Sequence, residues 1–113
     1  MASRQSTIDF IVDQISDAGD VSARKMFGEY GLYCNGKMVA LVCDDQLFVK
    51  PTAGGRSRLK TVTEASPYPR AKPYFLISAE MLEDHEALTE LIKITAKELP
   101  LPVKKKKNSA GKK

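Results

Sequence analysis

Residues 24–50 read RKMFGEYGLYCNGKMVALVCDDQLFVK, and in them short apolar runs alternate with residues that favour turns. Asn35-Gly36 is a strong signal for a two-residue type I′ hairpin turn, and Asp44-Asp45 indicates a second turn. This spacing predicts an antiparallel meander, in which the first two strands also read as one strand interrupted at Gly28. The expected strands span about 23–27, 30–34, 37–43 and 46–50.

The strand expected at 37–43 is apolar along most of its length instead of alternating, which predicts that both of its faces are covered. Counting outward from Asn35-Gly36 assigns alternate side chains to opposite faces of the sheet. One face receives Leu32, Val39, Leu41 and Phe48, and the other receives Tyr33, Met38, Ala40, Val42, Leu47 and Val49. Helices are expected on one face. Either residues 100–103 or a second copy of the protein would close the other, so a homodimer through the sheet is one hypothesis.

One helix is predicted before the meander in the sequence, and another is predicted near the C-terminal end. The first spans about 6–17, with Ser6 as its N-cap, because apolar residues recur at helical spacing at Ile8, Ile11, Val12 and Ile15. An acidic ridge runs along it, formed by Asp9, Asp13 and Asp17. We interpret the ridge as a solvated face, the alternative being a docking surface for a basic partner. The last helix spans about 85–99 and ends at Pro100.

The segment between the meander and the last helix is less regular. We expect a loop over 51–55, a short basic helix or turn around 56–62 and an irregular stretch over 66–69. A strand is predicted over 74–77, because Pro73 confines its start, and Ser78 is expected to cap a short helix over 79–82.

The 113 residues and the 42% hydrophobic share are those of one ordinary globular domain, which we place at residues 1–103. Residues 104–113 hold six lysines and no acid, and this lysine-rich tail is expected to be disordered. The tail accounts for the formal charge of +4, since residues 1–103 carry 12 basic and 14 acidic side chains. No apolar run has the length of a membrane span or of a secretory signal, so we expect a cytoplasmic protein without membrane contact.

The candidate reactive residues do not form a catalytic set. Cys34 and Cys43 are expected roughly 20 Å apart on neighbouring strands, which predicts two free thiols and no structural zinc site. His85 is the single histidine, and we interpret it as an exposed residue at a helix start. No nucleophile motif or ligand spacing accompanies it, so we expect a protein that is not an enzyme and holds no cofactor or metal.

Residues 50–72 hold six basic side chains and one acidic side chain, with Tyr68 and Tyr74 nearby. Gly54-Gly55, followed by cations, would suit an anion-binding nest, but a flexible connection is the preferred interpretation. Nucleic-acid binding through this segment and the tail is the alternative function. Its candidate contacts are Lys50, Arg56, Arg58, Lys60, Arg70, Lys72, Lys104, Lys105, Lys106 and Lys107.

The stretch 24–50 resembles the N-terminal domain of the TfoX/Sxy competence-regulator family. The residues that carry the resemblance are Met26, Phe27, Gly28, Gly31, Leu32, Tyr33, Gly36, Ala40, Leu41, Val42, Leu47 and Lys50. A weaker match continues through 67–68, 73–75 and 79–84, so the resemblance covers about residues 6–99. A motif of glycines and hydrophobic residues specifies a shape, and Gly28 and Gly31 permit a bend or bulge.

The resemblance implies a two-layer sandwich similar to secretion chaperones, with helices on one face of an antiparallel sheet in the order α-β-β-β-α-β-β-α. Asp45 stands where the family usually has glycine, which predicts a longer second hairpin. The resemblance also implies a bacterial regulator, since longer members with a second domain activate transcription of DNA-uptake genes alongside the cyclic-AMP receptor protein. We therefore expect a non-enzymatic regulatory or adaptor module that acts by protein contact through its sheet or acidic helices.

Overall fold

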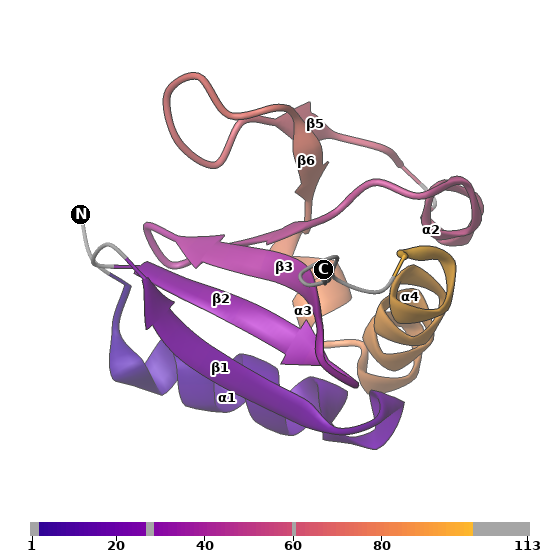
Figure 1. Ribbon diagram of the computed structural model, residues 1–113, viewed down its shortest axis with the longest axis horizontal. Helices are drawn as coiled ribbons and strands as arrows, with labels where there is room; N and C mark the ends of the chain where they lie inside the picture. The colour runs from indigo at the N-terminus through magenta and orange to yellow at the C-terminus, as the bar shows by residue number, and fades with distance from the viewer. Residues whose placement is uncertain (1–2, 27–28, 60, 101–113) are drawn as a thin grey trace, which may run out of the picture.

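A six-stranded antiparallel sheet in the order β1-β2-β3-β4-β6-β5 organises the chain (Figure 1). The computed structural model describes residues 3–26, 29–59 and 61–100. The strands are β1 (Val21–Met26), β2 (Glu29–Cys34), β3 (Lys37–Cys43), β4 (Gln46–Val49), β5 (Glu64–Ala65) and β6 (Tyr74–Leu76). The helices are α1 (Gln5–Ile15), followed by the 3₁₀ turn Ser16–Ala18, α2 (Ala53–Arg58), α3 (Ala79–Leu82) and α4 (His85–Glu98).

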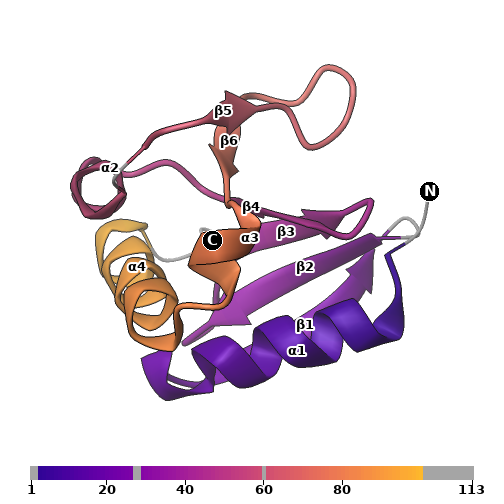
Figure 2. The same cartoon turned by 180° about the vertical axis from the view of Figure 1, so that it is seen from behind.

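Helices cover one face of this sheet, which confirms the predicted α+β sandwich. Helices α1, α3 and α4 lie on that side, and α4 also packs against α2 (Figure 2). The core between the layers is aliphatic, with Phe75 as its buried aromatic residue, and burial of these side chains is the main force that holds the layers together. Its largest members include Ile8, Ile11, Ile15, Leu32, Val42, Leu47, Val49, Leu88, Leu91 and Ile92.

The structure differs from the sequence prediction at several element boundaries and in the number of strands before α2. Four strands precede α2, one more than the implied order has, because β1 and β2 are separate antiparallel strands. The prediction that Ser6 caps the first helix was wrong, since α1 begins at Gln5 with Arg4 in the N-cap position. The loop expected at 51–55 is partly helical, because the Thr52 side chain accepts a hydrogen bond from the Gly55 amide and so caps α2.

A β-bulge in β3 changes which side chains face the core. Leu32 pairs with Ala40, but the next residue, Tyr33, pairs with Met38, so Val39 is an extra residue in β3. With this extra residue, Leu32 and Val39 face the core, while Tyr33 and Met38 face away from it. The faces predicted for these four residues were wrong, because counting alternate positions assumes an unbroken ladder.

Candidate docking surface

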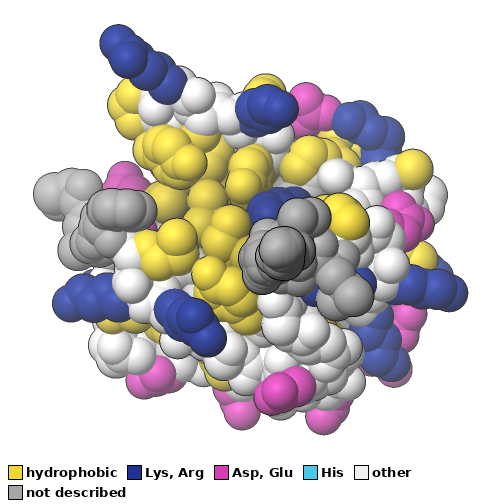
Figure 3. All heavy atoms as spheres, in the orientation of Figure 1, with side chains coloured by type: hydrophobic (Ala, Val, Ile, Leu, Met, Phe, Trp, Pro, Cys, Tyr) yellow, Lys and Arg dark blue, Asp and Glu magenta, His cyan; other side chains and the backbone are white. Residues whose placement is uncertain are grey.

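The side of the sheet opposite the helices carries a second apolar cluster, which we call the outer face. Its floor consists of Leu41, Cys43 and Phe48, whose exposed fractions are 7%, 8% and 4%. Partly buried side chains border the floor: Met38, Ala65, Tyr74 and Leu76. Apolar atoms form a continuous patch on this side of the molecule (Figure 3). Among the described residues, none from a helix belongs to the cluster.

Strand pairing assembles the outer face from distant parts of the sequence. Leu41 lies opposite Phe48, and Phe48 lies opposite Leu76. At the end of the sheet, Ala65 lies opposite Tyr74. The sequence does not identify Tyr74 and Leu76 as neighbours of Phe48, because the pairing of β4 with β6 spans α2 and β5 and has no local signal.

Two cations border the outer face. The Arg24 guanidinium lies over the ring of Tyr33, 5.1 Å from its centroid. Lys50 follows β4 and is half-buried, and burial lowers the pKa of its ammonium group. Within residues 3–26, 29–59 and 61–100, no carboxylate forms an ion pair with Lys50.

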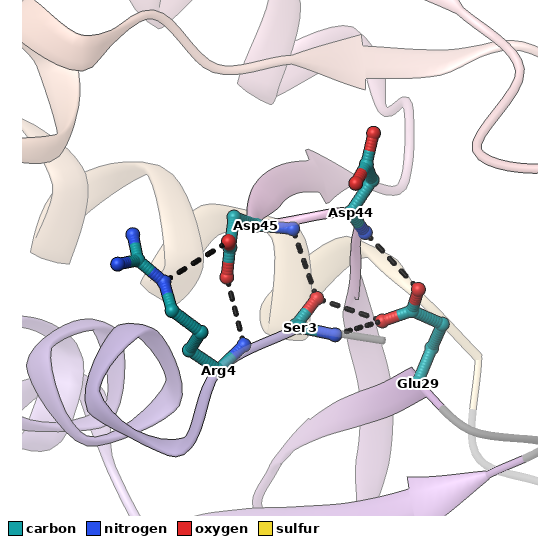
Figure 4. A network of polar contacts seen from close by, with 5 residues as sticks. All are labelled: Ser3, Arg4, Glu29, Asp44 and Asp45. Carbon is teal, nitrogen blue, oxygen red and sulfur yellow. Dashed lines mark hydrogen bonds and ion pairs between the residues drawn. The ribbon is translucent and has the colours of Figure 1, made fainter. Parts of the chain in front are cut away.

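A polar network ties the N-terminal residues to two hairpin ends (Figure 4). The Glu29 carboxylate accepts hydrogen bonds from the Ser3 amide and hydroxyl and from the Asp44 amide. The Ser3 hydroxyl accepts a hydrogen bond from the Asp45 amide, 3.0 Å away. The amide and Nε of Arg4 donate to the Asp45 carboxylate. The amide hydrogen bond is the main reason that the pKa of Asp45 lies below its ordinary value.

The same network fixes the turn between β3 and β4. Cys43 pairs with Gln46, so Asp44 and Asp45 alone form the turn, with φ angles of 53° and 60°. The expectation of a longer hairpin was therefore wrong. Both aspartates adopt the left-handed conformation that glycine adopts with less strain, and the hydrogen bonds donated by their amides hold them there.

Asp44→Gly is expected to stabilise the folded protein by roughly 0.5–1 kcal/mol, because it removes left-handed strain. The Asp44 carboxylate points away from the network, whereas Asp45→Gly would also lose the hydrogen bonds from Arg4 (Figure 4). Urea denaturation followed by circular dichroism measures both changes. A lower free energy of unfolding for Asp44→Gly than for the parent chain would contradict the argument.

The structure does not gather the candidate nucleic-acid contacts into one surface. Arg56 is paired with Glu64, and Arg58 lies with it on α2. Arg70 and Lys72 are exposed in the loop between β5 and β6, which lies at the opposite end of the molecule from α2 (Figure 1). Lys60 and Lys104 to Lys107 lie outside the described residues, as do the expected tail and the 101–103 segment.

The glycine-rich segment of α2 already has partners for its amides. The Gly54 amide donates to the Glu98 carboxylate at 3.0 Å, and the Gly55 amide donates to the Thr52 hydroxyl. The Arg56 amide donates to the Thr52 carbonyl. The chain itself therefore occupies the positions that an anion-binding nest would offer to a ligand.

The family-motif residues that the structure describes pack in the core, line the outer face or form turns. Leu32, Ala40, Val42 and Leu47 lie in the core, and Leu41 lies in the floor of the outer face. Gly31 leaves room for two methionines, since an added Cβ would lie 2.7 Å from the sulfur of Met26 and 3.3 Å from that of Met38. Gly36 has a φ of 83°, as its turn requires. Phe27 and Gly28 lie outside the described residues.

His85 lies at the start of α4, where its Nε2 is 3.2 Å from the Asp17 carboxylate. This contact joins the end of the acidic ridge to α4. No group of three or more His, Cys, Asp or Glu residues in the described part of the chain is placed to hold a metal ion. The described helices include none with the length and apolar character needed to cross a membrane.

The two cysteines are free, as predicted, and both are buried. Burial raises the pKa of both thiols, and the charges of Asp20 and Glu29 add to the shift at Cys34 and Cys43 respectively.

Below the ordinary pKa of 9.0, the thiols are neutral in both the folded and unfolded states, and above it the unfolded thiols ionise first. The free energy of unfolding is therefore expected to fall as the pH rises above about 9. Urea denaturation at neutral and alkaline pH tests this expectation. The Cys34→Ala, Cys43→Ala double variant should lose less stability than the parent chain, and an equal loss would contradict it.

The comparisons with known proteins agree with this architecture. The family model of the TfoX N-terminal domain matches residues 13–99. A Spirochaeta aurantia protein, called an uncharacterized 12.7 kDa protein in the trpE 5′ region, is 36% identical to this chain over 106 residues. These residues make up 94% of this chain and 91% of the relative. This chain belongs to the TfoX N-terminal domain family.

Proposed function

We propose that this chain is a non-enzymatic regulatory or adaptor module of the cytoplasm that binds a protein partner through its outer face. The observation that carries the proposal is the second apolar cluster, which lies away from the helices. An apolar patch rimmed by polar side chains is typical of protein-binding surfaces. Methionine, tyrosine and arginine are also enriched at interfaces, and Met38, Tyr74 and Arg24 lie on this side of the sheet. Phe48 is 4% exposed, so the partly buried border supplies most of the apolar surface.

Family membership supports a regulatory role for the module. By resemblance to longer TfoX members, the regulated process would be transcription linked to competence, and the partner would belong to the transcription machinery. The outer face supplies a surface for such a contact without any reaction at the site.

Leu76→Glu tests the proposal by placing a charge in the border of the outer face. Phe10→Glu is the matched control, because Phe10 is 46% exposed on α1, in the helical layer. We expect a partner captured from the source bacterium to be retained by the parent chain and by Phe10→Glu, and lost by Leu76→Glu. Quantitative mass spectrometry after cross-linking measures this difference. The same set of proteins on all three baits would contradict the proposal.

Nucleic-acid binding is the second candidate function. It is supported by the exposed cations Arg58, Arg70 and Lys72 and by Tyr68, whose side chain is 56% exposed. Titration with a labelled nonspecific duplex at about 50 mM and about 200 mM salt separates the two functions. Tight binding that weakens steeply with salt would favour this candidate over the protein-binding module.

A further inference from the structure

We propose that the partner of the outer face is an acidic, amphipathic protein segment, and that Lys50 anchors it by pairing with one of its carboxylates. This inference rests on the proposed function, because it names the kind of partner that the same surface binds. Its support comes from the positions of the cations and carboxylates around the apolar floor.

Lys50 lies beside this floor. Its amide donates to the Val39 carbonyl and so continues the strand beyond β4, which places its side chain on the same side of the sheet as Phe48. The side chain is half-buried, and no carboxylate of the described residues pairs with it. A partly desolvated ammonium group without a counterion costs free energy. A carboxylate on a docked partner would offset that cost through a charge-assisted hydrogen bond.

The other charges on this side of the sheet favour the same partner. Strand alternation places three charged residues of the described strands β1 to β4 and the residue after β4 on this side of the sheet. They are Arg24, Glu29 and Lys50. The Glu29 carboxylate already accepts hydrogen bonds from Ser3 and Asp44. The surface therefore offers two cations beside an apolar floor. A segment that carries both carboxylates and apolar side chains is its complement.

The same arrangement disfavours two other occupants. A second copy docked face to face would bring two sets of cations together, and the Glu29 carboxylates that could separate them already accept hydrogen bonds from Ser3 and Asp44. A nucleic acid needs cations spaced along its backbone. Here the strands between Arg24 and Lys50 present Tyr33, Met38 and Leu41 instead.

Peptide selection tests the inference. Short random peptides are selected for binding to the full chain, and the affinities of the selected peptides are then measured. We expect peptides that combine Asp or Glu with apolar residues. Lys50→Met is expected to weaken their binding roughly tenfold or more, because it removes a charge-assisted pair. Its thermal midpoint should stay the same or rise, since the unpaired charge is also gone. Lys93→Met removes an exposed cation from α4 and should leave the affinity unchanged.

A charge exchange separates ion pairing from shape. Lys50→Glu is expected to abolish binding, and a peptide with lysine in place of its acidic residue should restore it in part. If the selected peptides are neutral or basic, and Leu76→Glu still weakens their binding, the inference of an acidic partner is overturned and the proposed docking function stands. If no outer-face variant weakens the binding of the selected peptides, both the inference and the proposed function are overturned. Dimers in sedimentation at tens of micromolar that Leu76→Glu converts to monomers would assign the surface to a second copy and overturn the inference. Duplex DNA that displaces the peptides would assign it to nucleic acid and overturn the inference as well.

Discussion

Phe75→Ala is expected to lower the free energy of unfolding by about 3–5 kcal/mol, the usual cost of truncating a buried aromatic ring. The Phe75 side chain is fully buried, and it joins the core from β6. Two residue pairs connect β4 with β6: Phe48 with Leu76 and Val49 with Phe75. The Ile77 amide also donates to the Leu47 carbonyl, and β5 pairs with the other edge of β6. Because these ladders are short, we expect packing of the ring to contribute most to holding β6 in the sheet.

Urea denaturation measures this loss, and Phe10→Ala is its control. The Phe10 ring is 46% exposed, so its removal should change the free energy of unfolding by no more than about 0.5 kcal/mol. Because β6 also carries Tyr74 and Leu76, we expect Phe75→Ala to disturb the outer face as well. A loss of less than about 1 kcal/mol would mean that the backbone ladder, and not the ring, holds the strand in place.

Local signals in the sequence predict the centre of this fold. Asn35-Gly36 forms the predicted turn, with φ angles of 55° and 83°. The predicted stripe of Ile8, Ile11 and Ile15 is buried. Turn chemistry and helical periodicity depend on residues that are close in sequence, which is why both are predictable without a structure. The apolar run in β3 predicted that both of its faces are covered; helices cover one face, and no described helix covers the other.

The features that the sequence did not predict depend on contacts between distant residues. The Asp44-Asp45 turn stays short because Ser3, 42 residues from Asp45, accepts a hydrogen bond from its amide. Leu76 belongs to the outer face because β6 pairs with β4. The bulge at Val39 follows from the pairing of β2 with β3. The residue types at these positions do not indicate which distant residues they contact. The part of the candidate site that β6 contributes is therefore identified only in the folded chain.

Gly54→Val is expected to destabilise the fold by about 1–3 kcal/mol, because α2 approaches α4 so closely that a side chain at this position would overlap its neighbours. An added Cβ would lie 2.6 Å from Cγ1 of Ile94, and it would also overlap the Glu98 carboxylate. The Gly54 amide donates to that carboxylate, so moving the helices apart would break this hydrogen bond too. Urea denaturation measures the loss.

Ala53→Val is the matched control, because Ala53 is exposed in the same helix and its replacement should cost only about 0.5 kcal/mol in helix propensity. Ile94→Ala makes room for the added methyl groups, so a double-mutant cycle should show partial recovery of the Gly54→Val loss. Equal losses at positions 53 and 54 would mean that the glycine is not needed for packing, and the segment would again be a candidate for anion binding. A loss at position 54 that Ile94→Ala relieves instead assigns the glycine to the contact between the helices, where its amide belongs to Glu98 and not to a phosphate.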